Sequence, residues 1–312
     1  MIDFRYHLVS IVSIFLALAV GIVLGAGPLK EDLGNTLTSE VRNLRADKAT
    51  LRTQLDLAER GTQARDEFTT ASNRSLLASR LTDQTVAVLV LPGADAGLVK
   101  STTETLIAAG AKIGSSVQVQ DAWVDPEKAS FRSSLGQQLA SQVGVPLDAE
   151  GDVLDTVLAR SILTKAGSAS TGAAAALEVM RTGDLIKYSS DAVTPASVAV
   201  VVAGPVTGSD AAARTARATA LAQLAVAVDG AGAGAVLTGT SAVPGATNVT
   251  SVVTTVRDDN DMTDVLSTVD DGELPMGQAS VVFGILEQEA GKAGQYGLSG
   301  DATASFPQLA TK

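Results

Sequence analysis

The residues best suited to chemistry are seven carboxylates crowded into the seventeen positions 257–273: Asp258, Asp259, Asp261, Asp264, Asp270, Asp271 and Glu273. Carboxylates at this density could bind a hard cation. Their spacing does not match an EF-hand, which would need a glycine near Thr263 and a terminal glutamate. We therefore predict a solvated acidic loop without a metal site. A partner-docking patch formed by Asp258, Asp259, Asp261 and Asp264 is the functional alternative.

The inventory of catalytic side chains is otherwise poor. The chain has no cysteine, which excludes thiolate nucleophiles, disulfides and thiolate metal sites, and its one histidine is His7. Histidine-based acid–base catalysis and a histidine metal cluster are therefore excluded from the rest of the chain. There is no G-x-S-x-G motif. A lysine-activated serine stays formally open, but we predict that the protein is not an enzyme and has no catalytic residues.

The glycine-rich turns do not match a phosphate-binding loop. The turns at 92–95 and 204–209 follow strand-like runs, but neither is G-x-G-x-x-G or a Walker A loop. The alternating glycines at 230–234 follow a predicted helix and precede a predicted strand, which is the wrong order for phosphate binding. We expect these glycines to serve in loops and helix caps, and we predict no bound cofactor.

The elements that position these residues alternate between strands and helices. Continuous β-branched and leucine runs predict buried strands at 85–91 and 197–203, with a further strand at 111–118 and another starting at 235–239. Helices are predicted at 97–109, at 210–228 with Ser209 as N-cap, near 152–165 and 172–180, and at 278–290; residues 249–256 are strand-like. Two strand–turn–helix units predict an α/β Rossmann-like domain with a mainly parallel sheet over 83–297. Residues 298–312 are predicted to form a flexible C-terminal tail.

A run of 22 uncharged residues, 8–29, precedes this domain. As a helix it would be about 33 Å long, enough to cross a bilayer. A cleaved signal peptide is the alternative, although its apolar region is usually only about 7–15 residues long. Arg5 and His7 in the short tail 1–7 favour an N-terminus inside. We predict a single-pass plasma-membrane protein with a cytoplasmic tail and most of the chain outside the cytoplasm, and regard the outer membrane as the weaker alternative.

Residues 30–82 have the pattern of a coiled-coil stalk. Apolar side chains recur at alternating spacings of four and three residues, and one position of the seam is a lysine. The predicted seam consists of Leu37, Val41, Leu44, Lys48, Leu51, Leu55 and Ala58. It could form a homodimer or a hetero-oligomer with a membrane or envelope protein, and the alternative is an amphipathic helix packed on its own domain.

The net charge of −11 and the 3% content of aromatic residues set further limits. The acidic excess lies beyond residue 83, and this disfavours a nucleic-acid-binding role, because phosphates require a basic face. A core poor in aromatic residues must be built from alanine, valine and leucine, which suits closely packed α/β layers.

Two stretches of the sequence resemble a known protein family. The opening MIDFRYHLVSIVSIFLALAVGIVLGAGPL and the segment STVDDGELPMGQASVVFGILEQEAGKAGQYG at 267–297 resemble the actinobacterial envelope family named mycobacterial copper transport protein B. The chain also resembles corynebacterial relatives that act in daughter-cell separation with a membrane partner, upstream of peptidoglycan hydrolases. The family name implies copper efflux through an outer-membrane pore. Copper prefers Cys, Met and His ligands, whereas the region beyond the stalk offers only Met180, Met262 and Met276.

From these features we predict a non-enzymatic scaffold or regulator of cell-wall remodelling and cell separation. The lipid bilayer, through 8–29, and a partner protein are its expected contacts. Copper efflux, copper homeostasis or pore formation is the alternative that the family name implies.

Overall fold

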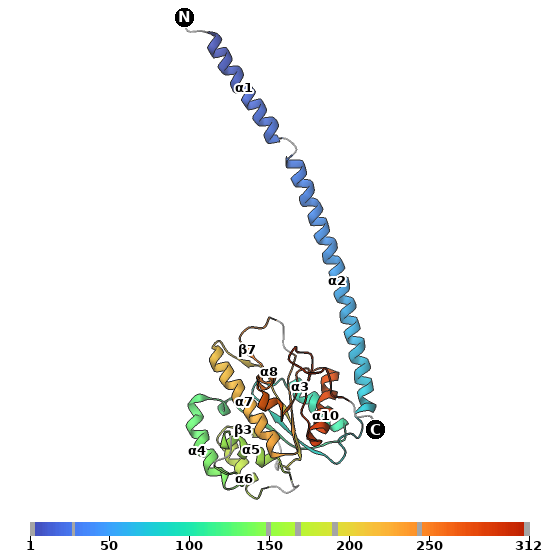
Figure 1. Ribbon diagram of the computed structural model, residues 1–312, viewed down its shortest axis with the longest axis vertical. Helices are drawn as coiled ribbons and strands as arrows, with labels where there is room; N and C mark the ends of the chain where they lie inside the picture. Colours follow the sequence, from blue (N-terminus) through green and yellow to red (C-terminus); the bar gives the residue numbers. More distant parts are fainter. Residues whose placement is uncertain are drawn as a thin grey trace. The chain divides into compact units, whose positions relative to one another are not determined.

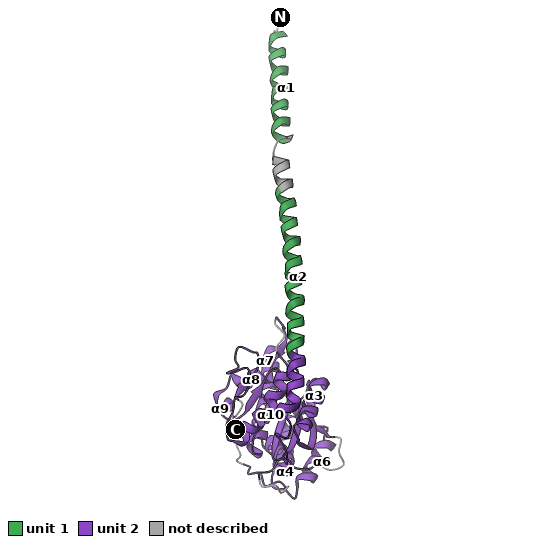
Figure 2. Cartoon of the chain, turned by 90° about the vertical axis from the view of Figure 1, so that its right-hand side faces the viewer, with its two compact units in different colours: residues 1–65 green, residues 66–312 purple. Residues whose placement is uncertain are grey.

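The computed structural model describes residues 4–26, 29–147, 151–165, 170–188, 193–241 and 245–308. The chain divides into two compact units, Met1–Arg65 and Asp66–Lys312, coloured separately in Figure 2. The first unit contains helix α1 (Phe4–Ala26) and most of helix α2 (Leu29–Leu76). The second contains the end of α2 and a sheet covered by helices (Figure 1).

The last turns of α2 belong to the second unit and are attached to it. The Asn73 side-chain amide donates a hydrogen bond to the carbonyl of Pro275, at the start of helix α10 (Pro275–Glu289), with an N–O distance of 2.7 Å. Leu77 and Leu81, just after the helix, are buried in the core. The backbone N–H of Leu81 donates to the carbonyl of Ala109. The predicted stalk therefore ends as a helix at residue 76, and residues 77–82 fold onto the domain.

A seven-stranded sheet forms the centre of the second unit, in the order β3-β2-β1-β4-β6-β8-β9. Neighbouring strands are parallel except for the antiparallel pair β2–β3. From the central β1–β4 pair the strands follow in chain order toward each edge of the sheet, as β1, β2, β3 on one side and β4, β6, β8, β9 on the other. This is the doubly wound arrangement of a Rossmann-like fold. The strands are β1 (Thr85–Val90), β2 (Lys112–Val119), β3 (Ile186–Tyr188), β4 (Val198–Val202), β6 (Ala235–Thr238), β8 (Ser267–Val269) and β9 (Gln295–Tyr296).

Helices cover both faces of the sheet and create two hydrophobic cores. On one face, Val88 and Val200 pack with side chains of α3 (Ala96–Ala108) and α10. On the other face, Leu89 and Val201 pack with α4 (Ala129–Ala140), α5 (Val153–Ile162), α6 (Ala173–Thr182), α7 (Ala211–Ala231) and α8 (Val252–Arg257). Successive residues of each central strand thus supply opposite cores, which explains why these strands are continuous apolar runs.

The remaining elements are small. A two-stranded antiparallel sheet joins β5 (Val206–Thr207) to β7 (Val249–Thr250). Two 3-10 turns, η1 (Asp121–Trp123) and η2 (Pro126–Lys128), precede α4, and the one-turn helix α9 (Asn260–Thr263) follows α8. These elements lie in the connections that follow strands β2, β4 and β6.

The sequence predicted the central strands and the helices α3, α5, α6, α7 and α10, and the structure confirms them. Two local predictions are wrong. Residues 249–256 form only the two-residue strand β7 before α8 begins, because the Ser251 hydroxyl caps α8 by accepting from the Thr254 N–H. The N-cap of α7 is Asp210, whose carboxylate accepts from two backbone N–H groups, and not Ser209.

Candidate functional site

The seam residues predicted from the sequence all lie on α2, and the structure leaves them exposed. The exposed fractions of the side chains are 63% for Leu37, 66% for Leu44, 64% for Leu51 and 57% for Leu55. Positions three and four residues apart share one face of a helix, so these side chains form a single stripe. Within the described residues no element covers this stripe. Because large apolar side chains in such a row usually mark a contact surface, we treat it as a candidate interface.

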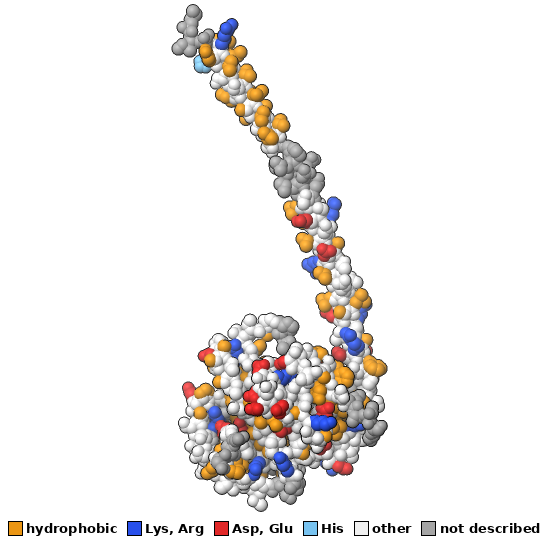
Figure 3. Space-filling view, in the orientation of Figure 1, with side chains coloured by type: hydrophobic (Ala, Val, Ile, Leu, Met, Phe, Trp, Pro, Cys, Tyr) orange, Lys and Arg blue, Asp and Glu red, His pale blue; other side chains and the backbone are white. Residues whose placement is uncertain are grey.

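Helix α1 presents a second apolar surface. The stretch Phe4–Gly25 is long and apolar enough to cross a membrane, and none of its most apolar part is buried. Figure 3 shows apolar side chains over α1 and a mixture of apolar and charged side chains along α2. The helix begins four residues before the predicted span 8–29, and Arg5 and His7 are helical. Residues 27 and 28 lie outside the described part.

The acidic segment separates into an exposed half and a buried half. Asp258, Asp259, Asp261 and Asp264, the predicted docking patch, are all exposed around α9. Two of them have structural roles, because Asp259 caps α9 through hydrogen bonds from the N–H groups of Asp261 and Met262, and Asp264 is its C-cap residue. The four residues therefore lie in or beside α9, with Asp258 at the end of α8, and binding of a partner there stays a prediction.

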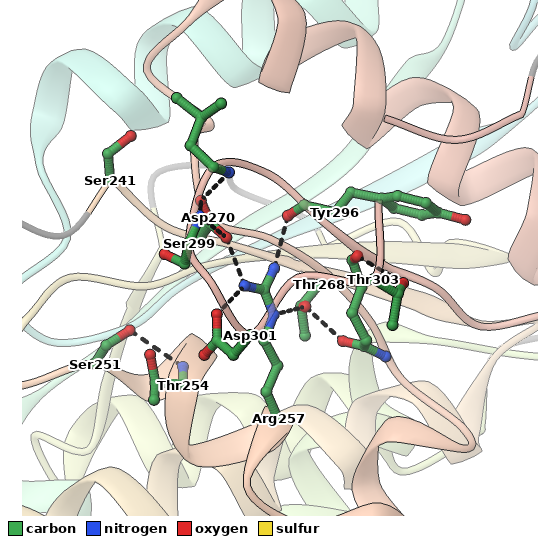
Figure 4. A network of polar contacts seen from close by, with 12 residues as sticks. Ser241, Ser251, Thr254, Arg257, Thr268, Asp270, Tyr296, Ser299, Asp301 and Thr303 are labelled. Atoms are coloured by element: carbon green, nitrogen blue, oxygen red, sulfur yellow. Dashed lines mark hydrogen bonds and ion pairs between the residues drawn. The ribbon is translucent and has the colours of Figure 1, made fainter. Parts of the chain in front are cut away.

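The buried half corrects the prediction of a solvated loop. Asp270 follows β8 and forms an ion pair with Arg257; the two side chains are 5% and 2% exposed. Arg257 also contacts the Asp301 carboxylate at 2.8 Å and donates to the Tyr296 carbonyl at 2.6 Å and to the Thr268 hydroxyl at 2.8 Å (Figure 4). All three guanidinium nitrogens therefore donate hydrogen bonds. This identifies the network as a structural clasp, by which we mean a set of contacts that joins α8, β8 and the C-terminal segment.

The C-terminal segment participates in this clasp. The backbone N–H groups of Leu298 and Ser299 donate to the Asp270 carboxylate. Ala304 bridges to Tyr296, and the Thr303 hydroxyl donates to the Gln295 carbonyl. Residues 298–304, which we predicted to begin a flexible tail, are thus hydrogen-bonded into the domain. Residues 309–312 of that predicted tail lie outside the described part.

Asp271 presents the opposite situation to Asp270. Its side chain is fully buried at the carboxyl end of β8, and neither carboxylate oxygen has a hydrogen-bond partner within the described residues. Burial, reinforced by the nearby Asp270 charge, raises the pKa of Asp271 to about 6. The Thr238 hydroxyl at the end of β6 and the Ser241 hydroxyl just after it also lack hydrogen-bond partners within the described residues. Polar groups without partners thus gather at the carboxyl ends of β6 and β8, the edge where α/β proteins bind ligands.

A second buried carboxyl lies on α5. Asp155 is 5% exposed and accepts a hydrogen bond of 2.8 Å from the indole N–H of Trp123. Burial, followed by the charge of Asp152, raises the pKa of Asp155 to about 8. The residue borders a hollow of about 350 Å³ between α5 and α7, to which Met262 also contributes. Burial therefore favours the protonated, neutral form of Asp155. Sequence reasoning missed it, although its place on the apolar face of an amphipathic helix was a usable signal.

Two glycine turns meet at the crevice where ligands bind most often in this fold. It lies where β1 and β4 diverge in chain direction. There, a Cβ atom on Gly204 would stand only 1.8 Å from the Gly93 carbonyl oxygen, so the two turns are in direct contact. In addition, the Asp95 carboxylate caps α3 by accepting from the Leu98 N–H at 2.9 Å. A carboxylate at this helix N-terminus takes the place that a phosphate would occupy.

The described residues contain no group of three or more His, Cys, Asp or Glu side chains placed to hold a metal ion. The methionines of the domain lie on three different helices. Met180 of α6 is fully buried in the hydrophobic core, whereas Met262 of α9 and Met276 of α10 are partly exposed. A soft metal ion such as Cu(I) is therefore offered single thioether side chains rather than a prepared cluster.

Comparison with known proteins gives a consistent result along the whole chain. A family model described as "Copper transport outer membrane protein, MctB" matches residues 1–307. The protein named Copper transporter MctB from Mycobacterium tuberculosis (strain H37Rv) is 28% identical over 308 residues, covering 95% of this chain and 96% of its own length. The protein of the same name from Mycobacterium leprae is 26% identical over 323 residues, covering 99% and 100%.

Proposed function

The chain belongs to the MctB family, and on that premise we propose that it is a membrane-anchored, non-enzymatic scaffold or regulator of cell-wall remodelling and cell separation. The observation that carries this proposal is the exposed apolar stripe on α2. A stripe with the periodicity of a coiled coil is suited to holding another helix. The protein would therefore act by contact with another protein rather than by chemistry of its own.

Helix α1 supports the anchoring part of the proposal. Its length and composition suit a single passage through the plasma membrane. With Arg5 at the cytoplasmic side, α2 and the α/β domain would lie outside the cytoplasm. The exposed carboxylates Asp258, Asp259, Asp261 and Asp264 are a proposed docking patch for an envelope protein there.

The polar groups of the domain support a role without catalysis. Asp155, Asp229 and Asp271 have pKa values raised toward neutrality by burial, and among the described residues none of them is hydrogen-bonded to a nucleophilic side chain. The fully occupied Arg257 is held in a structural network. The hydroxyls of Ser101 and Ser161, for example, donate to backbone carbonyls, whereas an activated nucleophile usually donates to a neighbouring base.

Copper handling is the second candidate function, and the names of the relatives favour it. Those proteins are called copper transporters and align with nearly the whole chain. If this chain carries copper, Met262 and Met276 are the accessible thioether ligands of the domain. Two or more chains would then have to contribute to one site, because Cu(I) is held by several soft ligands.

Deletion of the gene distinguishes the two functions. The scaffold proposal expects chained, unseparated cells and unchanged copper tolerance, and the wild-type gene should restore separation. Strong copper sensitivity with normal separation would contradict it. Titration of the purified full-length protein in detergent with Cu(I) gives an independent measurement. Tight stoichiometric binding that is lost in a Met262→Leu, Met276→Leu variant would favour copper handling.

A further inference from the structure

We infer that the stripe on α2 is occupied by the same stripe of a second copy of this chain, with the two helices parallel and in register. This inference rests on the proposed function, because it identifies the helix that would pair with α2 in the coiled coil. The inference follows from the charged side chains that border the stripe. The seam residues alone do not determine the partner or the orientation of the two helices.

The heptad positions are fixed by the spacing of the seam. Leu37, Leu44 and Leu51 fall on the d positions, and Val41 and Leu55 fall on the a positions. A β-branched residue at a combined with leucine at d favours two parallel strands over three or four. Lys48, also at an a position, disfavours larger bundles, because its ammonium must stay close to water.

The charged residues beside the seam select the partner. Glu40 and Asp47 occupy g positions, and Arg45 and Arg52 occupy e positions. In a parallel, in-register pair, each g residue faces the e residue five positions later on the other helix. Glu40 then faces Arg45 of the second copy, and Asp47 faces Arg52 of the second copy. Twofold symmetry repeats both attractive contacts.

The other arrangement of two copies is unfavourable. An antiparallel pair would place e positions opposite e positions and g positions opposite g positions, so that Arg45 would meet Arg52 and Glu40 would meet Asp47. Like charges would then line both sides of the seam. Two α1 helices that enter one membrane from the same side also require parallel stalks.

These four side chains are available for such contacts. Within the described residues, no ion pair involves Glu40, Arg45, Asp47 or Arg52, and all four are exposed on α2. In the parallel pair, the Lys48 ammonium also lies beside Asp47 of the second copy, since an a residue neighbours the preceding g residue of its partner. The one polar position of the seam thus gains an opposite charge.

Cysteine cross-linking tests the inference directly, because the chain has no cysteine of its own. Single variants Leu37→Cys, Leu44→Cys and Leu51→Cys of the full-length protein in detergent should each form a covalent dimer on mild oxidation. Asn43→Cys, on the outer face of the same helix turn, is the matched control and should form no covalent dimer. An antiparallel pair would cross-link near one crossing point only. Absent dimers at all three seam positions, or equal dimers at Asn43, would overturn the inference.

Charge reversal tests the register separately. The variant Glu40→Arg, Asp47→Arg should weaken the dimer by a factor of about 10 or more, measured by sedimentation equilibrium in detergent. Adding Arg45→Glu and Arg52→Glu to the same chain should recover most of the lost affinity, but the dimer should stay weaker than the wild type, because Asp47→Arg also places a like charge beside Lys48. Circular dichroism confirms that α2 stays helical in every variant. Equal dimerisation of all these proteins would refute the assigned ion pairs.

The deletion strain separates the two levels of the proposal. If deletion leaves cells chained while the seam variants never cross-link, the scaffold function stands and the seam receives a different protein. If the cells separate normally, the proposed function fails, whatever the oligomeric state. If the Glu40→Arg, Asp47→Arg variant fails to complement and the fourfold variant complements, both levels are supported.

Discussion

Replacing Arg257 by methionine should cost the domain about 3 kcal/mol of unfolding free energy, although the residue is not part of the proposed interface. Methionine keeps most of the apolar stem and removes the guanidinium. The Arg257 side chain is 2% exposed and is paired with a carboxylate that is itself 5% exposed. Breaking a buried ion pair from one side leaves the other charge buried, which typically costs 3–5 kcal/mol.

The remaining contacts place the loss at the lower end of that range. Asp270 keeps two backbone N–H donors, from Leu298 and Ser299, so its charge is not left without partners. The Tyr296 carbonyl still accepts from the Asp270 N–H. Asp301, 30% exposed, can be rehydrated. The cost is therefore concentrated in the one buried carboxylate.

Urea denaturation of the full-length protein in detergent, followed by tryptophan fluorescence, provides the measurement. The chain has a single tryptophan, Trp123, and its side chain is buried in the domain core, so the signal reports on domain unfolding. Asp301→Asn is the control and should cost less than about 1 kcal/mol, because that pair is partly exposed.

The double variant Arg257→Met, Asp270→Asn tests whether the loss of stability comes from the buried carboxylate that Arg257→Met leaves unpaired. Removing the buried charge should recover at least about 1 kcal/mol of the loss, because the unpaired carboxylate is then replaced by a neutral amide. A single-variant loss below about 1 kcal/mol, or a double variant that is less stable than Arg257→Met alone, would refute the assignment of the network as a structural clasp.

Two further predictions concern buried carboxyls and close backbone contacts. The pKa of Asp155 is raised from 3.8 to about 8, and that of Asp271 from 3.8 to about 6. Between these two values of each group the folded state keeps a proton that the unfolded state has released. The free energy of unfolding therefore falls as the pH rises from 3.8 to about 6 for Asp271 and from 3.8 to about 8 for Asp155. The stabilising effect of Asp271→Asn should therefore stop growing near pH 6 and that of Asp155→Asn near pH 8, as measured by urea midpoints across this range; a flat pH dependence would contradict the burial argument. Gly204→Ala should prevent normal folding, since its Cβ would stand 1.8 Å from the Gly93 carbonyl oxygen, whereas Gly230→Ala, with no atom within 4 Å of the new Cβ, should stabilise α7 by about 0.5–1 kcal/mol in the same denaturation assay. Equal effects of the two glycine substitutions would show that the turn contact is not close-packed.

The central strands could be predicted because each is buried on both faces. A run such as 197–203 places alternate valines in two different cores, and no surface-facing polar residue interrupts it. Strands β3, β8 and β9 have only two or three residues, too few to establish a period, and their pairing is set by neighbours distant in sequence. Helix α4 was missed because serine, glutamine and arginine fill much of its length.

The seam of α2 was predicted for a different reason. Its periodicity extends over several turns and needs no information from the rest of the chain, since residues three and four apart share a face wherever the helix lies. The end of the helix depends on tertiary contacts instead. Leu77 and Leu81 continue the apolar character of the stalk, but their burial beside α3 and α10 ends the helix at residue 76. Local pattern therefore determined the stripe, and packing determined its boundary.

The acidic segment shows why side-chain type alone could not locate the buried site. Composition treats seven carboxylates alike, yet Asp259 caps an exposed turn, Asp270 is neutralised by Arg257, and Asp271 is buried without a partner. The difference arises from their places in the fold, because β8 ends at Val269 and the two residues that follow it, Asp270 and Asp271, have different neighbours. Asp270 is paired with Arg257 and accepts from two backbone N–H groups. Asp271 has no hydrogen-bond partner within the described residues, and its burial, together with the nearby Asp270 charge, raises its pKa.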